Sequence, residues 1–147
     1  RGFADRGFGR LAVRSILLDT NAYCDLLRGD RRVLAEIGSS AQVLMSAIVL
    51  GELYQGFHGG NRYRQNLALL REFMADPTVA TIAVTADTSE LFGKIKHQLR
   101  LAGTPIPIND VWIASQCLQV GAVLVTSDLH FTKVPGLQLW DGLADRS

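Results

Sequence analysis

The sequence has few cysteines and histidines and no long hydrophobic run. Its 147 residues include two cysteines, Cys24 and Cys117, which lack the spacing of metal ligands and are predicted to be buried small side chains. No apolar stretch approaches the roughly 20 residues needed to cross a bilayer, and the first residues lack the apolar segment of a secretory signal. We therefore expect a protein without a membrane anchor in the reducing cytoplasm.

The sequence also has little net charge, since its formal net charge at pH 7 is +1. The first 14 residues hold four arginines and one aspartate, so the rest of the chain is slightly negative. This balance is unlike that of a protein that coats nucleic acid non-specifically. The basic residues still cluster, either as solvated helix faces or as a rim that tracks phosphates; the clusters are Arg28, Arg31 and Arg32, then Arg62, Arg64 and Arg71, then Lys94, Lys96 and Arg100.

Short apolar runs alternate with segments of helical periodicity along most of the chain. Runs at 15–18, 43–45, 79–84 and 122–126 are typical of strands buried on both faces, and 137–139 of a short edge strand. Helices are predicted to begin near residues 22, 30, 47, 61, 85 and 108. This alternation predicts an α/β fold with a mostly parallel sheet covered by helices. Residues 15–147 form one domain in this interpretation, and the glycine- and arginine-rich residues 1–14 form a tail.

Two aspartates follow predicted strands. Asp19 ends the first strand, and Asp128 comes just after the fourth. Ligands of parallel α/β sheets bind at the carboxyl ends of the strands, so the topology offers both side chains to one crevice. Each alone could equally be a helix cap.

Asp110 lies in the first turn of its predicted helix, on the face that points to the core. Ile113, Ala114, Cys117 and Leu118 follow it at helical spacing. A carboxylate on that face needs a hydrogen bond, an ion pair or a metal. Compensation of the helix dipole would explain an acid in the first turn, but not one that faces inward.

Glu52 is the fourth candidate, in an apolar helix without a basic residue three or four positions away. Several carboxylates in one crevice repel each other unless a cation lies among them. Oxygen ligands without histidine or cysteine spacing favour Mg²⁺ or Mn²⁺ over zinc. Such a site suits hydrolysis of phosphodiesters. His130, two residues after Asp128, stays outside this acidic set.

Four segments in order resemble the motifs of PIN-domain nucleases, most closely the VapC-type toxins of bacterial toxin–antitoxin pairs. They are residues 16–21 (ILLDTN), 46–53 (SAIVLGEL), 108–115 (INDVWIAS) and 125–128 (VTSD). The resemblance covers residues 15 to about 141.

The resemblance implies a three-layer α/β/α sandwich with a central sheet of four to five strands. It also implies an endoribonuclease that depends on Mg²⁺ or Mn²⁺, a VapB-type antitoxin as partner, and a homodimer. By motif, Asp19, Glu52, Asp110 and Asp128 would form the catalytic acidic cluster, with Asp19 and Asp110 as principal metal ligands. Residues that would support these ligands or position RNA are Thr20, Asn21, Ser46, Asn109, Thr126 and Ser127.

Two other functions stay open at this stage. One is a phosphatase or phosphoacceptor domain, although Asn21 stands where the phosphatase motif wants a second acid. The other is a binding module without activity. A partner could occupy an apolar groove, or its lining could be ordinary core; the candidate residues are Tyr23, Leu26, Leu27, Tyr54, Phe57 and Tyr63.

Overall fold

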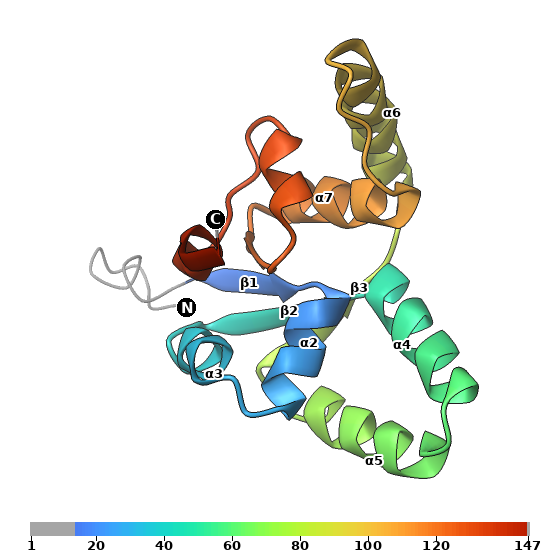
Figure 1. Cartoon of the computed structure of the whole chain (residues 1–147), viewed down its shortest axis with the longest axis vertical. Helices are drawn as coiled ribbons and strands as arrows, with labels where there is room; N and C mark the ends of the chain where they lie inside the picture. The colour runs from blue at the N-terminus through green and yellow to red at the C-terminus, as the bar shows by residue number, and fades with distance from the viewer. Residues whose placement is uncertain (1–13, 147) are drawn as a thin grey trace.

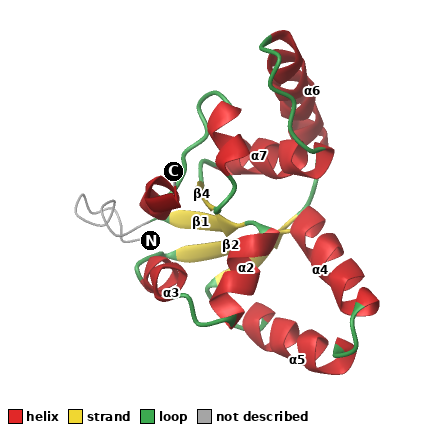
Figure 2. Ribbon diagram, viewed as in Figure 1, coloured by secondary structure: helices red, strands yellow, loops and turns green. Residues whose placement is uncertain are grey.

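Four short parallel strands form one sheet in the computed structural model, which describes residues 14–146 (Figures 1 and 2). Their order is β3-β2-β1-β4. The strands are β1 (Ser15–Leu18), β2 (Gln42–Ser46), β3 (Val79–Ile82) and β4 (Val123–Val125). The predicted edge strand at 137–139 is present only as a bridge between Leu124 and Leu139.

Helices cover both faces of this sheet, which confirms the predicted α/β architecture. In Figures 1 and 2, α2 to α5 lie on one side and α6 and α7 on the other, with α6 extending away from the sheet. The helices are α2 (Thr20–Leu27), α3 (Arg31–Gly38), α4 (Ala47–Gly59), α5 (Tyr63–Met74), α6 (Ala86–Leu101) and α7 (Ile108–Val120). Two 3-10 helices follow, η1 (Leu129–Lys133) and η2 (Asp141–Arg146).

The order of the strands creates a switch point between β1 and β4. The chain moves outward from β1 through β2 to β3, and then crosses back to β4 on the other side of β1. The connections that leave β1 and enter β4 therefore run over opposite faces of the sheet. A crevice opens at the carboxyl ends of such a pair of strands, and Asp19 and Asp128 follow those two ends.

Side-chain caps fix where most helices begin. Asp19 caps α2 by accepting a hydrogen bond from the Ala22 amide, and Ser46 caps α4 through the Ile48 amide. Thr85 and Thr88 form a capping box at α6. The helix predicted to open at Asn61 begins instead at Tyr63, without a side-chain cap.

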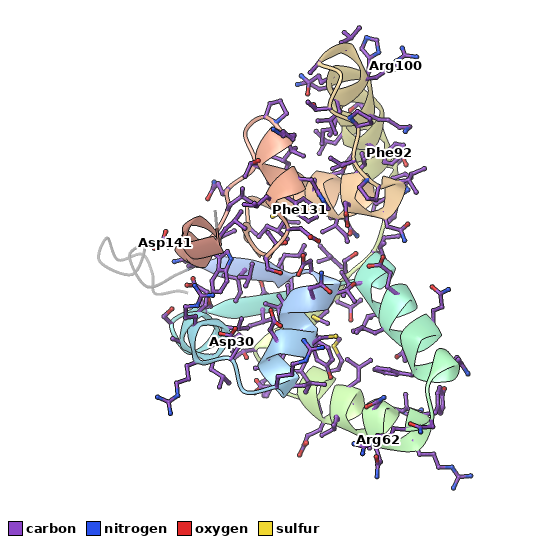
Figure 3. The ribbon with its side chains drawn as sticks, in the orientation of Figure 1. Asp30, Arg62, Phe92, Arg100, Phe131 and Asp141 are labelled. Carbon is purple, nitrogen blue, oxygen red and sulfur yellow. The ribbon has the colours of Figure 1, made fainter. Side chains whose placement is uncertain are left out.

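The core is continuous through the sheet. Ile16, Leu17 and Leu18 on β1 are fully buried because layers cover both faces. Phe131 of η1, labelled in Figure 3, is also fully buried and anchors the segment after β4.

Two residues of the candidate partner groove belong to the core, which is one of the two alternatives left open for them. Tyr23 has no exposed surface and packs edge-on against Phe73, with ring centroids 5.4 Å apart. Phe57 is buried as well. Both side chains fill the layer between α2, α4 and α5, whereas Leu27 and Tyr54 of the same set are exposed.

Residues 1–13 of the predicted tail lie outside the described residues. Arg14, its last residue, is bonded to the folded body: its carbonyl accepts from the Ala41 and Gln42 amides, and its side chain pairs with Glu36. Within residues 14–146, no helix is long and apolar enough to cross a membrane.

Gly121→Ala is expected to lower the free energy of unfolding by about 1–2 kcal/mol. Gly121 ends α7 with a φ of +70°, and a side chain there is strained although space is open around it. Urea unfolding followed by circular dichroism measures the change.

Gly56→Ala is the matched control, in an exposed helical position of α4 where an added Cβ meets nothing within 4 Å. It is expected to raise the free energy of unfolding by about 0.5–1 kcal/mol. Effects of the same sign at both glycines would contradict this account of how α7 ends.

Candidate active site

A pocket of about 440 Å³ opens at the switch point of the sheet. The pocket is formed by residues at the ends of β1 and β4, by the start of α7 and by Glu52 of α4. The lining residues are Asp19, Thr20, Asn21, Glu52, Pro107, Ile108, Asn109, Asp110, Asp128 and His130. The structure thus brings all four predicted acids to one pocket, from positions up to 109 residues apart in the sequence.

Asp19 is the most buried of these acids, with 3% of its surface exposed. Its amide donates to the Val125 carbonyl, at 3.2 Å, and continues the pairing of β1 with β4. One carboxylate oxygen accepts from the Ala22 amide, at 2.8 Å, and the other accepts from the Thr126 hydroxyl. The same hydroxyl accepts from the Asp128 amide, at 3.0 Å, so Thr126 links the two aspartates.

Asp110, Asp128 and His130 lie close together in the pocket. The Nε2 atom of His130 lies 2.7 Å from Asp110 Oδ2 and 4.0 Å from Asp128 Oδ2. One ligand atom from each of these three residues lies within 4.8 Å of the others. Asp110 therefore has the inward placement that its helical phase predicted, and it is partly buried.

Glu52 is held by side chains from two other helices. Its Oε1 accepts from the Thr20 hydroxyl, at 2.5 Å, and its Oε2 accepts from the side-chain Nδ2 of Asn109, at 3.3 Å. Thr20 and Asn109 thus support an acid that no local ion pair explains. Both also line the pocket, as does the exposed Asn21.

The other supporting candidates lie away from the pocket lining. Ser46 is fully buried, donates to the Gln116 side chain and caps α4, so its contacts are those of a cap inside the fold. Thr126 is buried beneath Asp19. Ser127 is partly exposed between Thr126 and Asp128.

The electrostatics of the pocket are those of crowded carboxylates. Burial raises the pKa of Asp19 to about 6, against the hydrogen bonds from Thr126 and Ala22, and the charges of Asp128 and Asp110 add to the rise. Burial also raises the pKa of Asp110, although the hydrogen bond with His130 opposes it. Among residues 14–143, no lysine or arginine forms an ion pair with any of the four acids.

This donor set fits a divalent cation. Carboxylates that crowd together without basic partners are stable when a cation lies among them. Within the part of the chain that the structure describes, Asp110, Asp128 and His130 form the one group of three that could hold a metal ion. Asp19 adds a buried carboxylate beside them.

His130 belongs to this site, although sequence patterns offered little reason to choose it. It follows Asp128 by two positions, but η1 turns it back toward Asp110 on α7, twenty residues away in sequence. The only available signal was its position just after a strand-end acid. A contact between residues 20 positions apart on two different elements leaves no periodic pattern in the sequence.

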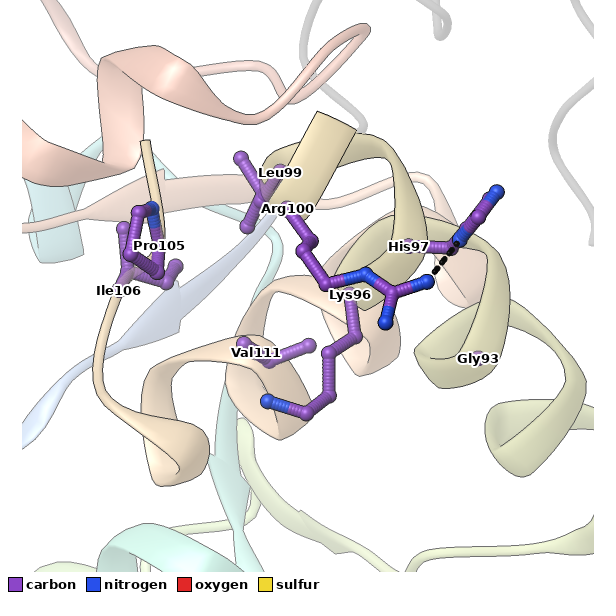
Figure 4. Close-up of a pocket in the computed structure, with 8 residues that line it drawn as sticks. All are labelled: Gly93, Lys96, His97, Leu99, Arg100, Pro105, Ile106 and Val111. Carbon is purple, nitrogen blue, oxygen red and sulfur yellow. Dashed lines mark hydrogen bonds between the residues drawn. The ribbon is translucent and has the colours of Figure 1, made fainter. Parts of the chain in front are cut away.

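A second cavity, of about 410 Å³, lies between α6 and the connector that leads to α7 (Figure 4). It has an apolar wall and a basic rim, and no carboxylate lines it. Its lining is Gly93, Lys96, His97, Leu99, Arg100, Pro105, Ile106 and Val111. Arg100 is hydrogen-bonded to His97, at 3.2 Å. The acidic and the basic cavity therefore share the segment around Pro105–Val111 but differ in chemistry.

Comparison with known proteins identifies the class of this fold and site. A family model described as the PIN domain matches residues 16–137, which is most of the chain. The fold and the acid-lined pocket thus define a PIN domain.

Individual relatives narrow the assignment. Ribonuclease VapC1 of Haemophilus influenzae is 29% identical over 130 residues, which cover 85% of this chain and 96% of that protein. Ribonuclease VapC2 of Rickettsia felis is 31% identical over 102 residues, or 67% of this chain and 75% of that protein. The chain therefore belongs to the VapC ribonucleases of the PIN-domain family, the toxins of VapBC toxin–antitoxin systems.

Solved structures agree with this assignment. The crystal structure of VapBC2 from Rickettsia felis, bound to a DNA fragment from its promoter, matches with a TM-score of 0.77 and 26% identity. The match covers 86% of this chain and 99% of that chain. Homologues have thus been crystallised as VapBC toxin–antitoxin complexes. The family assignment contradicts the phosphatase and phosphoacceptor hypothesis.

Asp19→Asn is expected to raise the free energy of unfolding of the metal-free protein by about 1–3 kcal/mol at neutral pH. Because burial raises the pKa of Asp19 from 3.8 to about 6, its ionised form costs stability. That cost is absent below about pH 4, grows as the pH rises toward 6 and is complete above 6. Asparagine keeps the cap on α2 but carries no charge.

Urea unfolding in the presence of EDTA, repeated across this pH range, measures the effect. The control is Asp87→Asn, an exposed acid in the first turn of α6. A difference between the Asp19 variant and the parent that is the same at acidic and neutral pH would show that the charge of Asp19 is not the cause.

Proposed function

We propose that this chain is a metal-dependent endoribonuclease that acts as the toxin of a toxin–antitoxin pair and uses Mg²⁺ or Mn²⁺. The observation that carries the proposal is the pocket at the β1–β4 switch point, where Asp19, Glu52, Asp110 and Asp128 converge without a lysine or arginine in the lining. The proposal places the activity in one domain, residues 15–147, with residues 1–14 as an extension.

In this proposal Asp19, Asp110 and Asp128 hold the cation. Asp19 is fixed on both carboxylate oxygens, and Thr126 sets its position relative to Asp128. Asp110 enters from the other side of the pocket on the first turn of α7. A divalent cation supplies stabilisation of phosphate charge and acidifies a water molecule.

Glu52 has a different role from the other acids in this proposal. Each of its oxygens already accepts one hydrogen bond, from Thr20 or from Asn109. These contacts hold the carboxylate at the rim of the pocket with lone pairs still free. Glu52 is therefore placed to orient a water molecule and to accept its proton as the scissile phosphate is attacked.

The substrate class follows from the family and from the charge of the chain. RNA is the proposed substrate, and its affinity cannot come from bulk positive charge, since the net charge is +1. The basic groups that exist are local, such as Lys96 and Arg100 around the second cavity. This distribution favours a folded RNA that is recognised by shape.

Two protein partners belong to the proposal, a VapB-type antitoxin and a second copy of the chain. Leu27 and Tyr54 are large, exposed side chains on α2 and α4, the helices beside the pocket, and they suit an antitoxin segment. Leu101 and Ile108 are 72% and 57% exposed at the two ends of the connector between α6 and α7. Apolar surface of this kind suits contact between two copies.

Asp110→Asn is expected to reduce RNA cleavage by at least about 100-fold, because loss of a metal ligand costs at least as much as loss of the groups that orient one. The far-UV circular dichroism should stay unchanged. Sequencing of RNA ends after incubation with the purified protein and Mn²⁺ measures cleavage and identifies the sites. The matched control is again Asp87→Asn, which should cleave like the parent.

Equal cleavage by the Asp110 variant and the parent would contradict the proposal. So would cleavage that persists after EDTA treatment. A chain that binds a partner but gives no Mn²⁺-dependent thermal shift would instead support the binding-module hypothesis.

Tyr54→Glu is expected to abolish co-purification of the small protein encoded beside this chain, since a charge would be placed in the antitoxin contact. Leu34→Glu is the control, because Leu34 is similarly exposed but lies on α3.

Light scattering on the same preparations measures the mass of the chain without its partner. The parent should have the mass of a dimer, and Leu101→Glu should have the mass of a monomer. Repeated isolation of the parent as a free, non-toxic monomer would refute both partner assignments.

A further inference from the structure

The three residues that can share a metal ion are not all acids. Asp110 and Asp128 contribute carboxylates, and His130 contributes an imidazole from η1. The ring of His130 lies against the fully buried Phe131, with centroids 4.9 Å apart. Its position in the pocket therefore depends on a core anchor and not on a flexible loop.

We propose that His130 is a direct ligand of the metal ion, beside Asp110 and Asp128, and that it biases the site toward Mn²⁺ over Mg²⁺. This inference rests on the proposed function, since it concerns the same site, but it adds a nitrogen to the all-oxygen set that the motifs predict.

The distances agree with a shared ion. An octahedral site with ligands about 2.0–2.1 Å from the ion has neighbouring ligand atoms about 2.9 Å apart and opposite ones about 4.1 Å apart. The Nε2 atom of His130 lies 2.7 Å from one aspartate oxygen and 4.0 Å from the other. These two distances are close to those of a neighbouring and an opposite ligand of one ion. One ligand atom from each of the three groups lies within 4.8 Å of the others. His130 and Asp110 are also hydrogen-bonded to each other.

The chemistry of the donors sets the expected preference. Mg²⁺ is a hard ion that takes oxygen ligands and keeps its waters, whereas imidazole binds transition metals more readily. Mn²⁺ has the same charge as Mg²⁺ and accepts both kinds of donor. An imidazole in the site therefore adds more to the affinity for Mn²⁺ than to that for Mg²⁺.

The other two histidines provide internal controls. His58 packs against Tyr63 with the rings tilted and their centroids 4.4 Å apart, and His97 is hydrogen-bonded to Arg100 beside the second cavity. Neither lines the acidic pocket. Since the chain has three histidines, any imidazole nitrogen bound to a metal in this pocket has to come from His130.

Electron spin-echo envelope modulation of the untagged full chain loaded with Mn²⁺ tests the assignment directly. The parent should show modulation from a ¹⁴N nucleus of imidazole. His130→Gln should lose it, and His58→Gln and His97→Gln should keep it. Calorimetric titration should show that His130→Gln weakens Mn²⁺ binding by about tenfold or more, while Mg²⁺ binding changes by less than about threefold.

The possible failures are distinguishable. Mn²⁺ bound by the parent without nitrogen modulation would overturn the assignment of His130 and leave the proposed function intact. The same conclusion would follow if His130→Gln kept the parent's affinity for both ions. Failure of the parent to bind Mn²⁺ would overturn the assignment of His130, and failure to bind either Mn²⁺ or Mg²⁺ would overturn the proposed function as well.

Discussion

The hydrogen bonds of Asp19 are the constraint on which the site depends. Its amide extends the pairing of β1 with β4, its carboxylate caps α2, and the Thr126 hydroxyl joins it to the segment that carries Asp128. One residue, through its backbone amide and its carboxylate, thereby joins two strands and a helix at the switch point of the sheet. The same contacts bury the carboxylate, and that burial is the main cause of its raised pKa. The contacts that join these elements therefore also account for the burial that raises the pKa of Asp19.

The rest of the pocket brings four carboxylates together without a lysine or arginine in the lining. Thr20 and Asn109 donate hydrogen bonds to Glu52, and His130 is hydrogen-bonded to Asp110, whose pKa burial nevertheless raises. Such crowding costs stability in the fold, and a ligand that binds only the folded state offsets a cost of this kind. Natural sites often keep groups that are unfavourable for folding because function requires them.

Local pattern was enough to predict part of this site. Strand ends identified Asp19 and Asp128, and helical phase identified Asp110, because both rules follow from the geometry of one element. The contacts that support Glu52 come from residues 32 and 57 positions away, and that of His130 with Asp110 spans 20, so no periodicity encodes them. Tyr23 shows the same limit, since its helix position left both a groove and the core open and packing against Phe73 placed it in the core.

The acidic and the basic side chains line different cavities. The acidic pocket has no lysine or arginine in its lining, and Lys96 and Arg100 border a different cavity on the other side of the connector at Pro105–Pro107. An RNA phosphate is repelled by four carboxylates, so in the proposed function the cation must attract the substrate as well as assist hydrolysis. Basic side chains close to the acids would attract RNA but would also compete with the cation for the carboxylates. Because the basic side chains lie apart from the acids, the carboxylates stay available to a metal ion. In the proposed function, residues outside the acidic pocket then select the RNA.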